Sequence, residues 1–167
     1  MEIWDAYYKD GTKAGCDLIR DEVIPTGLYL LVCEILVRHI DGDYLLMQRD
    51  MSKPNDAGRY EASAGGSALK GEASLSCAKR ELFEETGIKS DSFIEIGRST
   101  THNTIYHLYL CTTDCDKTSI SLQKDETMSY KWLCEKDFIH FINSNEIIKS
   151  QKERYYSYFV KKGYILK

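Results

Sequence analysis

The chain has 167 residues, of which 43% are hydrophobic and 29% charged, values typical of a folded globular protein rather than a disordered one. Its 22 Lys and Arg against 26 Asp and Glu give a net charge of −4. A protein that grips a nucleic-acid backbone normally carries a basic surplus, so we expect no nucleic-acid partner. No repeat or linker divides the sequence, and we expect a single domain over residues 1–167.

The sequence also favours one cellular compartment. The six cysteines form no C-x-x-C pair, and the opening Met1–Asp5 is acidic and polar, unlike a secretory signal. The longest apolar run, residues 28–37, is broken by Glu34 and is too short to span a bilayer. We therefore expect a cytoplasmic protein with free thiols and no membrane segment.

Two β-hairpins are predicted in the N-terminal part of the chain. Asp10-Gly11 and Asp41-Gly42 are strong signals for tight turns, and each lies between segments of strand-like composition. The four predicted strands cover residues 3–8, 14–20, 28–39 and 44–49.

The remaining chain predicts one central helix, further strands and terminal helices. Residues 72–86 are expected to be helical because Leu75, Ala78 and Leu82 recur on one face, and Gly87 follows where a left-handed cap commonly ends a helix. A loop is expected over residues 50–60, strands over 60–64, 93–99, 104–112 and 128–134, and helices over 135–143 and 146–162. This mixture predicts an α+β domain.

Three carboxylates are predicted to share one face of the central helix. Glu81, Glu84 and Glu85 fall within an arc of about 100°. Like charges at this spacing destabilise a helix, and a hard divalent cation with oxygen ligands would remove the repulsion. Arg80 can hold one carboxylate in a fixed rotamer, and a glycine-rich turn at Gly65-Gly66 would bring backbone close to a ligand. The pattern indicates either a metal site or a solvated acidic face.

A phosphate-binding P-loop is excluded. Gly66-x-x-x-x-Gly71 has the glycine spacing of that motif, but Glu72 stands where the motif requires Lys. A carboxylate at that position would repel phosphate.

The run from Gly66 to Ile88 resembles the Nudix box, G-x5-E-x7-R-E-U-x-E-E-x-G-U, where U is a bulky aliphatic residue. Leu82 and Ile88 occupy the U positions, and all fixed positions match: Gly66, Glu72, Arg80, Glu81, Glu84, Glu85 and Gly87. The start of the chain resembles the hairpin of a bacterial subgroup related to isopentenyl-diphosphate isomerase. The resemblance implies the Nudix (MutT-type) fold, a mixed β-sheet sandwiched between helices (α/β/α). Residues 1–27 would form a hairpin extension, and residues 66–88 would form the loop–helix of the box.

The same resemblance implies a role for individual residues. The metal ligands would be Glu81, Glu85, Glu84, the carbonyl of Gly65 and an acid from a later loop, Glu126. Glu84 could instead organise water, and Asp125 is the second candidate for the loop acid. Arg80 would orient the helix carboxylates, and Glu72 would brace the junction of loop and helix. Independently of the resemblance, Arg49 and Lys53 precede the box and could either reach substrate phosphates or be solvated surface residues, and the backbone at Gly66 could also contact a ligand.

The implied activity is that of a magnesium-dependent pyrophosphohydrolase. Mg²⁺, which Mn²⁺ could replace, would neutralise the anhydride oxygens and activate water for attack on phosphorus. The substrate would be a small nucleoside diphosphate linked to another moiety, whose identity depends on loops outside the box. Glu84 or Glu126 could act as general base. The N-terminal hairpin could pair across a homodimer.

Two other functions remain open at this stage. An isomerase of the isopentenyl-diphosphate type would need a cysteine immediately before the box, where this chain has Ala64-Gly65-Gly66, and its box would be incomplete. A nucleotide-binding Nudix module without turnover would be free to lose box acids, but this chain has all of them.

Overall fold

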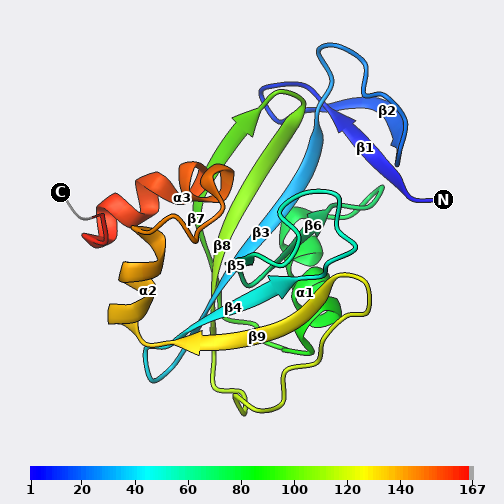
Figure 1. Ribbon diagram of the computed structural model, residues 1–167. Coiled ribbons are helices and arrows are strands. Elements are labelled where there is room, and N and C mark those ends of the chain that lie inside the picture. Colours follow the sequence, from blue (N-terminus) through cyan, green and yellow to red (C-terminus); the bar gives the residue numbers. More distant parts are fainter. Residues whose placement is uncertain (166–167) are drawn as a thin grey trace.

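Two β-sheets and three helices make up residues 1–165, the part of the chain that this computed structural model describes (Figure 1). The strands are β1 (Ile3–Tyr7), β2 (Lys13–Ile19), β3 (Leu30–His39), β4 (Tyr44–Arg49), β5 (Tyr60–Ala62), β6 (Ala64–Ser67), β7 (Phe93–Thr101), β8 (Thr104–Thr113) and β9 (Thr127–Leu133). The helices are α1 (Ser74–Thr86), α2 (Glu135–Ile142) and α3 (Lys149–Lys162). The predicted hairpins and helices are confirmed, as are the other predicted strands, with shifts of one to three residues at their ends. The segment 60–64, predicted as one strand, is divided between β5 and β6. The predicted turn at Gly65-Gly66 is wrong, because both glycines lie in β6 and pair with Glu34 and Cys33 of β3.

The large sheet is mixed. Its strand order is β5-β4-β3-β8-β7, with β6 also paired to β3 and β9 also paired to β4. Strands β3 and β8 run parallel from the Leu30–Thr104 pair to the His39–Thr113 pair, and the other pairs in this sheet are antiparallel. Strands β1 and β2 form a separate antiparallel hairpin.

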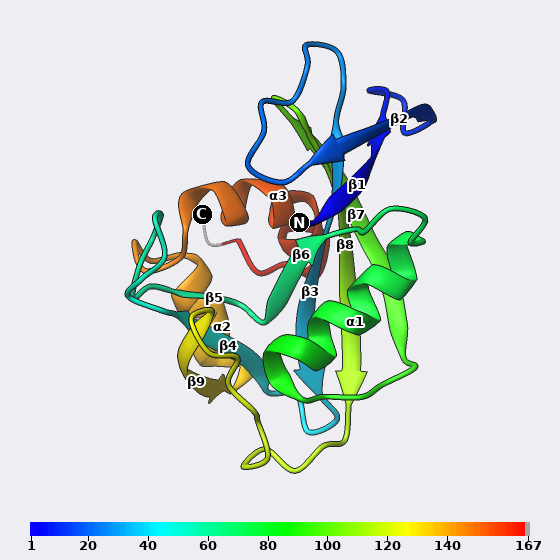
Figure 2. The ribbon, with the colours of Figure 1, turned by 90° about the vertical axis from the view of Figure 1, so that its right-hand side faces the viewer.

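Helices cover both faces of the large sheet, as the predicted α/β/α arrangement requires. Helix α1 lies against one face and α2 and α3 lie against the other (Figures 1 and 2). Strand β3 serves both layers, since Cys33, Ile35 and Val37 pack into the core beside α1, whereas Leu36 packs into the aromatic core beside α2 and α3. Burial of alternate residues on two sides explains why this strand is almost continuously apolar.

Helix α1 differs in two details from the prediction. It begins at Ser74 rather than Glu72, because the Glu72 carboxylate accepts a hydrogen bond from the N–H of Leu69 at 2.9 Å in the preceding turn. Leu75, which the spacing places on the same helix face as the buried Ala78 and Leu82, is itself 42% exposed. Leu75 lies in the first turn, and the buried residues of the helix begin at Cys77.

Gly87 ends α1 in the left-handed conformation, as predicted. Its φ is 75°, and its N–H donates to the carbonyl of Phe83 at 2.8 Å. An added Cβ would lie 3.1 Å from the Cβ of Ser121, whereas at Gly163, which caps α3 at φ 73°, no neighbouring atom of residues 1–165 lies within 4 Å of that position.

Gly87→Ala is therefore expected to destabilise the protein more than Gly163→Ala. Both substitutions place a side chain in the left-handed region, at a cost of about 1–2 kcal/mol in the free energy of unfolding. Only Gly87→Ala adds the contact with Ser121. Denaturant unfolding of both variants would measure the difference, and equal losses of stability would contradict this account of the cap.

Two further observations concern the expectations about thiols and membranes. Each of the six cysteines is a free thiol. No helix in residues 1–165 has the length and apolar character needed to cross a membrane.

Candidate active site

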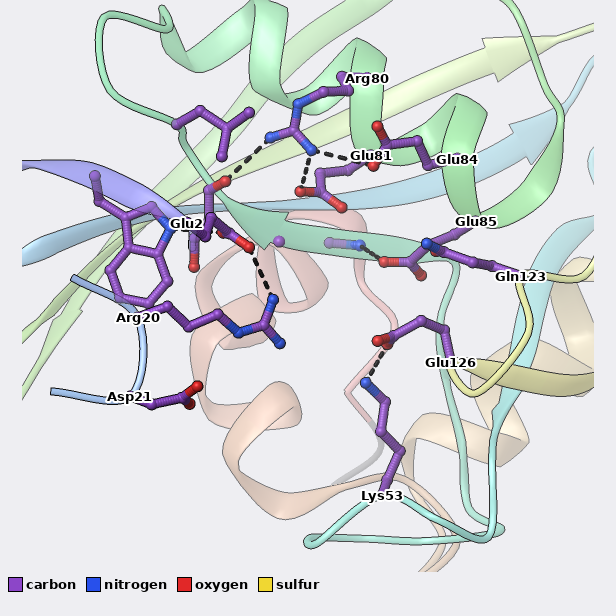
Figure 3. A pocket seen from close by; sticks show the side chains of 15 residues that line it. Glu2, Arg20, Asp21, Lys53, Arg80, Glu81, Glu84, Glu85, Gln123 and Glu126 are labelled. Carbon is purple, nitrogen blue, oxygen red and sulfur yellow. Dashed lines mark hydrogen bonds and ion pairs between the residues drawn. The ribbon is translucent and has the colours of Figure 1, made fainter. Parts of the chain in front are cut away.

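A polar cleft of about 570 Å³ lies beside the acidic face of α1 (Figure 3). The box helix, strand β6, the N-terminal hairpin and the loops before β5 and β9 all contribute to its walls. Its lining includes Glu81, Glu84, Glu85, Arg80, Gly65, Gly66, Lys53 and Glu126, which are among the residues predicted for the site. Ligand sites are commonly clefts of this size, about 300–1,000 Å³.

Arg80, in the middle of α1, donates hydrogen bonds to three carboxylates. Its Nε and Nη2 donate to the two oxygens of Glu72 at 2.9 and 2.8 Å, and its Nη1 donates to Glu81 at 2.6 Å and Glu84 at 3.2 Å. Desolvation opposes ionisation of Glu72, but the hydrogen bonds from Arg80 and from the N–H of Leu69 outweigh it and lower the pKa of this carboxyl. The paired geometry of a guanidinium with a carboxylate restricts the rotamers of both side chains.

Glu85 differs from Glu72, whose charged form is stabilised by hydrogen bonds from Arg80. Its side chain is buried at 8% exposure, and among residues 1–165 its hydrogen-bond donor is the N–H of Gly65 at a long 3.3 Å. Desolvation, reinforced by repulsion from Glu61, Glu81 and Glu126, raises the pKa of Glu85 well above its usual value. A buried carboxylate costs stability unless it is paired with a cation or bound to a metal.

Gly66 allows Glu81 to approach the strand that faces it. A Cβ added at Gly66 would lie 2.3 Å from the carboxyl carbon of Glu81, a distance that side chains do not tolerate. Burial raises the pKa of Glu81, although Arg80 opposes this effect. The absence of a side chain at position 66 therefore allows the Glu81 carboxylate to lie against β6.

The predicted loop acid lies on the far wall of the cleft. Glu126 forms an ion pair with Lys53, and both residues line the cleft (Figure 3). Asp125, the second candidate, does not line it. The two loops that precede β5 and β9 thus meet through one lysine and one glutamate beside Glu85.

A smaller cavity of about 280 Å³ adjoins the cleft and shares Glu85, Lys53 and Glu126 with it. Arg49 lies in this smaller cavity, where its Nη1 donates to Glu61 at 3.0 Å. A second cation, Arg154, donates from Nε to Glu34 at 3.0 Å on the same lining. Arg49 is therefore near the box carboxylates but already has an anionic partner.

The donor set fits a hard divalent cation that is completed by substrate. Within residues 1–165, no three His, Cys, Asp or Glu side chains already form a ligand cluster for a metal ion. Glu81 and Glu84 contact Arg80, and Glu126 contacts Lys53, whereas Glu85 forms no ion pair with any residue in this part of the chain. Mg²⁺ usually takes one or two carboxylates together with waters and substrate phosphates, so a closed cage of protein ligands is unnecessary.

Several residues that line these cavities were missed from the sequence. Glu2, Trp4, Arg20 and Asp21 belong to the N-terminal hairpin and the loop after it, and no local pattern marked them as part of a site. Glu61 could have been found, because an acid inside the otherwise small and apolar segment before the box is unusual. The Glu34–Arg154 pair joins residues 120 positions apart, which no sequence spacing reveals.

The linings also bear on the isomerase alternative. None of the residues that line either cavity is a cysteine. Cys77 within the box and Cys33, which pairs with Gly66 across β3 and β6, are both buried in the core. The structure therefore offers no thiol to a ligand in the cleft.

Comparisons with known proteins agree with one another. The NUDIX domain family matches residues 31–157. An uncharacterized Nudix hydrolase of Listeria monocytogenes is 29% identical over 155 residues, covering 89% of each chain, and Nudix hydrolase 3 of Arabidopsis thaliana is 27% identical over 160 residues, covering 87% of this chain and 21% of the plant protein.

Solved structures show the same fold. A crystal structure from Deinococcus radiodurans superposes with a TM-score of 0.73 at 19% identity, covering 91% of this chain and 96% of that one. The NUDIX domain of Shewanella oneidensis NrtR, crystallised with ADP-ribose, superposes with a TM-score of 0.54 at 16% identity, covering 67% and 77%. With Glu81, Glu84 and Glu85 gathered on one cleft and the family matched over residues 31–157, the chain belongs to the Nudix hydrolase family.

Proposed function

We propose that this protein is a Mg²⁺-dependent hydrolase that cleaves a phosphoanhydride bond in a nucleoside diphosphate linked to a second moiety. The observation that carries the proposal is Glu85, a buried carboxylate that forms no ion pair within residues 1–165, beside Glu81 in a cleft of nucleotide size. A structural role alone does not explain why an unpaired charge is buried there, since it destabilises the metal-free fold.

The metal would be held by Glu85 and Glu81, with Glu84, Glu126 and the carbonyl of Gly65 as further oxygen donors. When bound, such an ion neutralises phosphate oxygens and lowers the pKa of a water molecule so that it can attack phosphorus. Mn²⁺ would be accepted for the same reason, because carboxylate and carbonyl oxygens suit both ions.

The remaining residues would position the reactants and move the proton. Arg80 contacts Glu72, Glu81 and Glu84 and would keep the helix carboxylates in place during turnover. Lys53 lies at the cleft and Arg49 at the adjoining cavity, where both could contact phosphate oxygens. Glu84 or Glu126 would take the proton of the attacking water. Positioning and charge stabilisation supply most of the catalysis in reactions of this type.

The substrate class is supported by the chemistry of the cleft and by one structural neighbour. The cleft is predominantly polar, with acids on the metal side and cations at its edges, as a diphosphate requires. The Shewanella oneidensis domain was crystallised with ADP-ribose, which is a nucleoside diphosphate linked to a second sugar. We therefore place ADP-ribose, nucleotide sugars and dinucleotides ahead of nucleoside triphosphates.

The test is turnover of a panel of such compounds with and without Mg²⁺. ADP-ribose, a nucleotide sugar, a dinucleotide and a nucleoside triphosphate are incubated with the protein, and the products are separated. We expect metal-dependent release of a nucleoside monophosphate and a second phosphate ester from at least one diphosphate compound. If nucleotides bind without turnover anywhere on the panel, the protein is a binding module and the proposed function is wrong.

A further inference from the structure

The N-terminal hairpin forms one wall of the cleft, although it lies outside the family-matched residues 31–157. Glu2 and Trp4 of the first strand region line the cleft, as do Arg20 and Asp21 just after β2. Figure 3 shows Glu2, Arg20 and Asp21 across the cleft from Glu85 and Glu126. A ligand held at the box carboxylates would therefore extend toward the hairpin.

The hairpin is fixed to the box loop of its own chain. The N–H of Lys70 donates to the carbonyl of Ile3 at 2.9 Å, and the N–H of Gly71 donates to the carboxylate of Asp5 at 2.8 Å. The ammonium of Lys70 also pairs with Asp17 of β2 at 2.7 Å. These bonds place the hairpin side chains at a defined position relative to the helix that begins a few residues later.

Glu2 orients the two large side chains of this wall. Its Oε1 accepts from the indole Nε1 of Trp4 at 2.6 Å, and its Oε2 accepts from Nη1 of Arg20 at 2.8 Å. The charge of Glu2 is thereby neutralised, and 57% of the Arg20 side chain remains exposed for other partners. The carboxylate of Asp21 adds a hydrogen-bond acceptor to the same wall.

We propose that this wall is the subsite for the nucleoside half of the substrate, an inference that rests on the proposed function. The indole of Trp4 would stack on the nucleobase, Arg20 would contact the phosphate attached to that nucleoside, and Asp21 would accept from ribose hydroxyls. An aromatic plane, a guanidinium and an acceptor are the groups that recognise a base, a phosphate and a sugar. The box acids on the opposite wall serve the scissile diphosphate.

Fluorescence tests the stacking without requiring turnover. The chain contains two tryptophans, so Trp132→Phe leaves Trp4 as the sole indole. Trp132 is suited to this change because it packs near His39 and does not line the cleft. We expect AMP with Mg²⁺ to quench Trp4 emission saturably, while ribose 5-phosphate, which lacks the base, leaves it unchanged. In the reciprocal variant Trp4→Phe, AMP should leave the emission of Trp132 unchanged.

Kinetics on the best substrate of the panel supply the second test. Trp4→Leu and Arg20→Gln are each expected to raise KM about 10-fold with little change in kcat, since loss of stacking or of one ionic contact weakens binding more than chemistry. Tyr8→Leu and Lys9→Gln are the matched controls, because both residues are exposed on the same hairpin and line neither cavity.

The outcomes separate this inference from the proposed function. In one outcome the wild type hydrolyses its substrate, Trp4→Leu and Arg20→Gln have the kinetics of the two controls, and AMP does not quench Trp4. The proposed hairpin subsite is then wrong, and the proposed hydrolase activity is unaffected. If no compound is hydrolysed yet AMP quenches Trp4, the proposed function is wrong and the subsite remains. If Trp4→Leu folds poorly, the kinetics of Arg20→Gln and the AMP titration of the Trp132→Phe variant still test the hairpin subsite.

Discussion

Replacing Glu85 with glutamine is expected to lower Mg²⁺-dependent turnover by a factor on the order of 10²–10³ while making the metal-free protein more stable. The loss of turnover follows from removing the charge that would hold the cation, because glutamine keeps the shape of the side chain. The gain in stability follows from burial, since Glu85 is 8% exposed and none of the described residues forms an ion pair with it.

The sign of the stability change follows from the raised pKa of Glu85. Burial disfavours the charged form in the folded state, so the folded protein loses stability as pH rises from the unfolded pKa of Glu, about 4.3, through the raised folded value. Above that value the wild type carries a penalty of about 1–3 kcal/mol that Glu85→Gln lacks. For a chain of this size the melting temperature rises by about 2–4 °C for each kcal/mol.

Thermal unfolding at pH 8, with a chelator and with Mg²⁺, measures both effects. Mg²⁺ should raise the melting temperature of the wild type and leave that of Glu85→Gln unchanged, because a ligand stabilises only the state that binds it. Glu84→Gln is the matched control for the metal-free state, since Glu84 is 44% exposed on its side chain and pairs with Arg80 at the surface. Equal stabilisation of wild type and Glu85→Gln by Mg²⁺ would contradict the assigned metal site.

Gly66→Ala is the second substitution with a large expected effect. The added Cβ would meet the Glu81 carboxylate at 2.3 Å, so Glu81 must leave its position beside Arg80 or β6 must shift. We expect turnover to fall about 10- to 100-fold, because displacement of a catalytic group by about 1 Å can cost that much. The Mg²⁺ concentration for half-maximal activity should rise as well.

Gly97→Ala is the matched control for this substitution. Gly97 also lies in a strand of the large sheet, and its added Cβ would contact the side chain of Leu108 at an ordinary 3.5 Å. Metal titrations of activity for both variants would give the comparison. If Gly66→Ala showed the activity and metal requirement of Gly97→Ala, the close approach of Glu81 would have no catalytic importance.

The sequence predicted those features that depend on neighbouring residues. Asp10-Gly11 and Asp41-Gly42 indicated tight turns, and Gly87 indicated the end of α1, because positive φ is a property of single residues. Helical spacing likewise places Glu81, Glu84 and Glu85 on one face, although only the resemblance to the Nudix box favoured a metal site over a solvated acidic face. Local chemistry was sufficient in each case.

Contacts between distant segments could not be predicted in this way. The docking of the hairpin on the box loop depends on Lys70 and Gly71 meeting Ile3 and Asp5, and no periodicity encodes that meeting. Leu75 is exposed although it shares a helix face with Ala78 and Leu82, because spacing gives the direction of a side chain and not what packs against it. Tertiary packing decided both outcomes.

Isotope incorporation during turnover tests the central claim most directly. The best substrate of the panel is hydrolysed with Mg²⁺ in water enriched in ¹⁸O, and the two phosphate products are analysed by mass. Attack of water on phosphorus predicts one ¹⁸O atom in the phosphate of one product, with the position identifying the phosphorus attacked. Products formed without label, or an isomer of the starting compound in place of two phosphate esters, would contradict phosphoanhydride hydrolysis at this cleft.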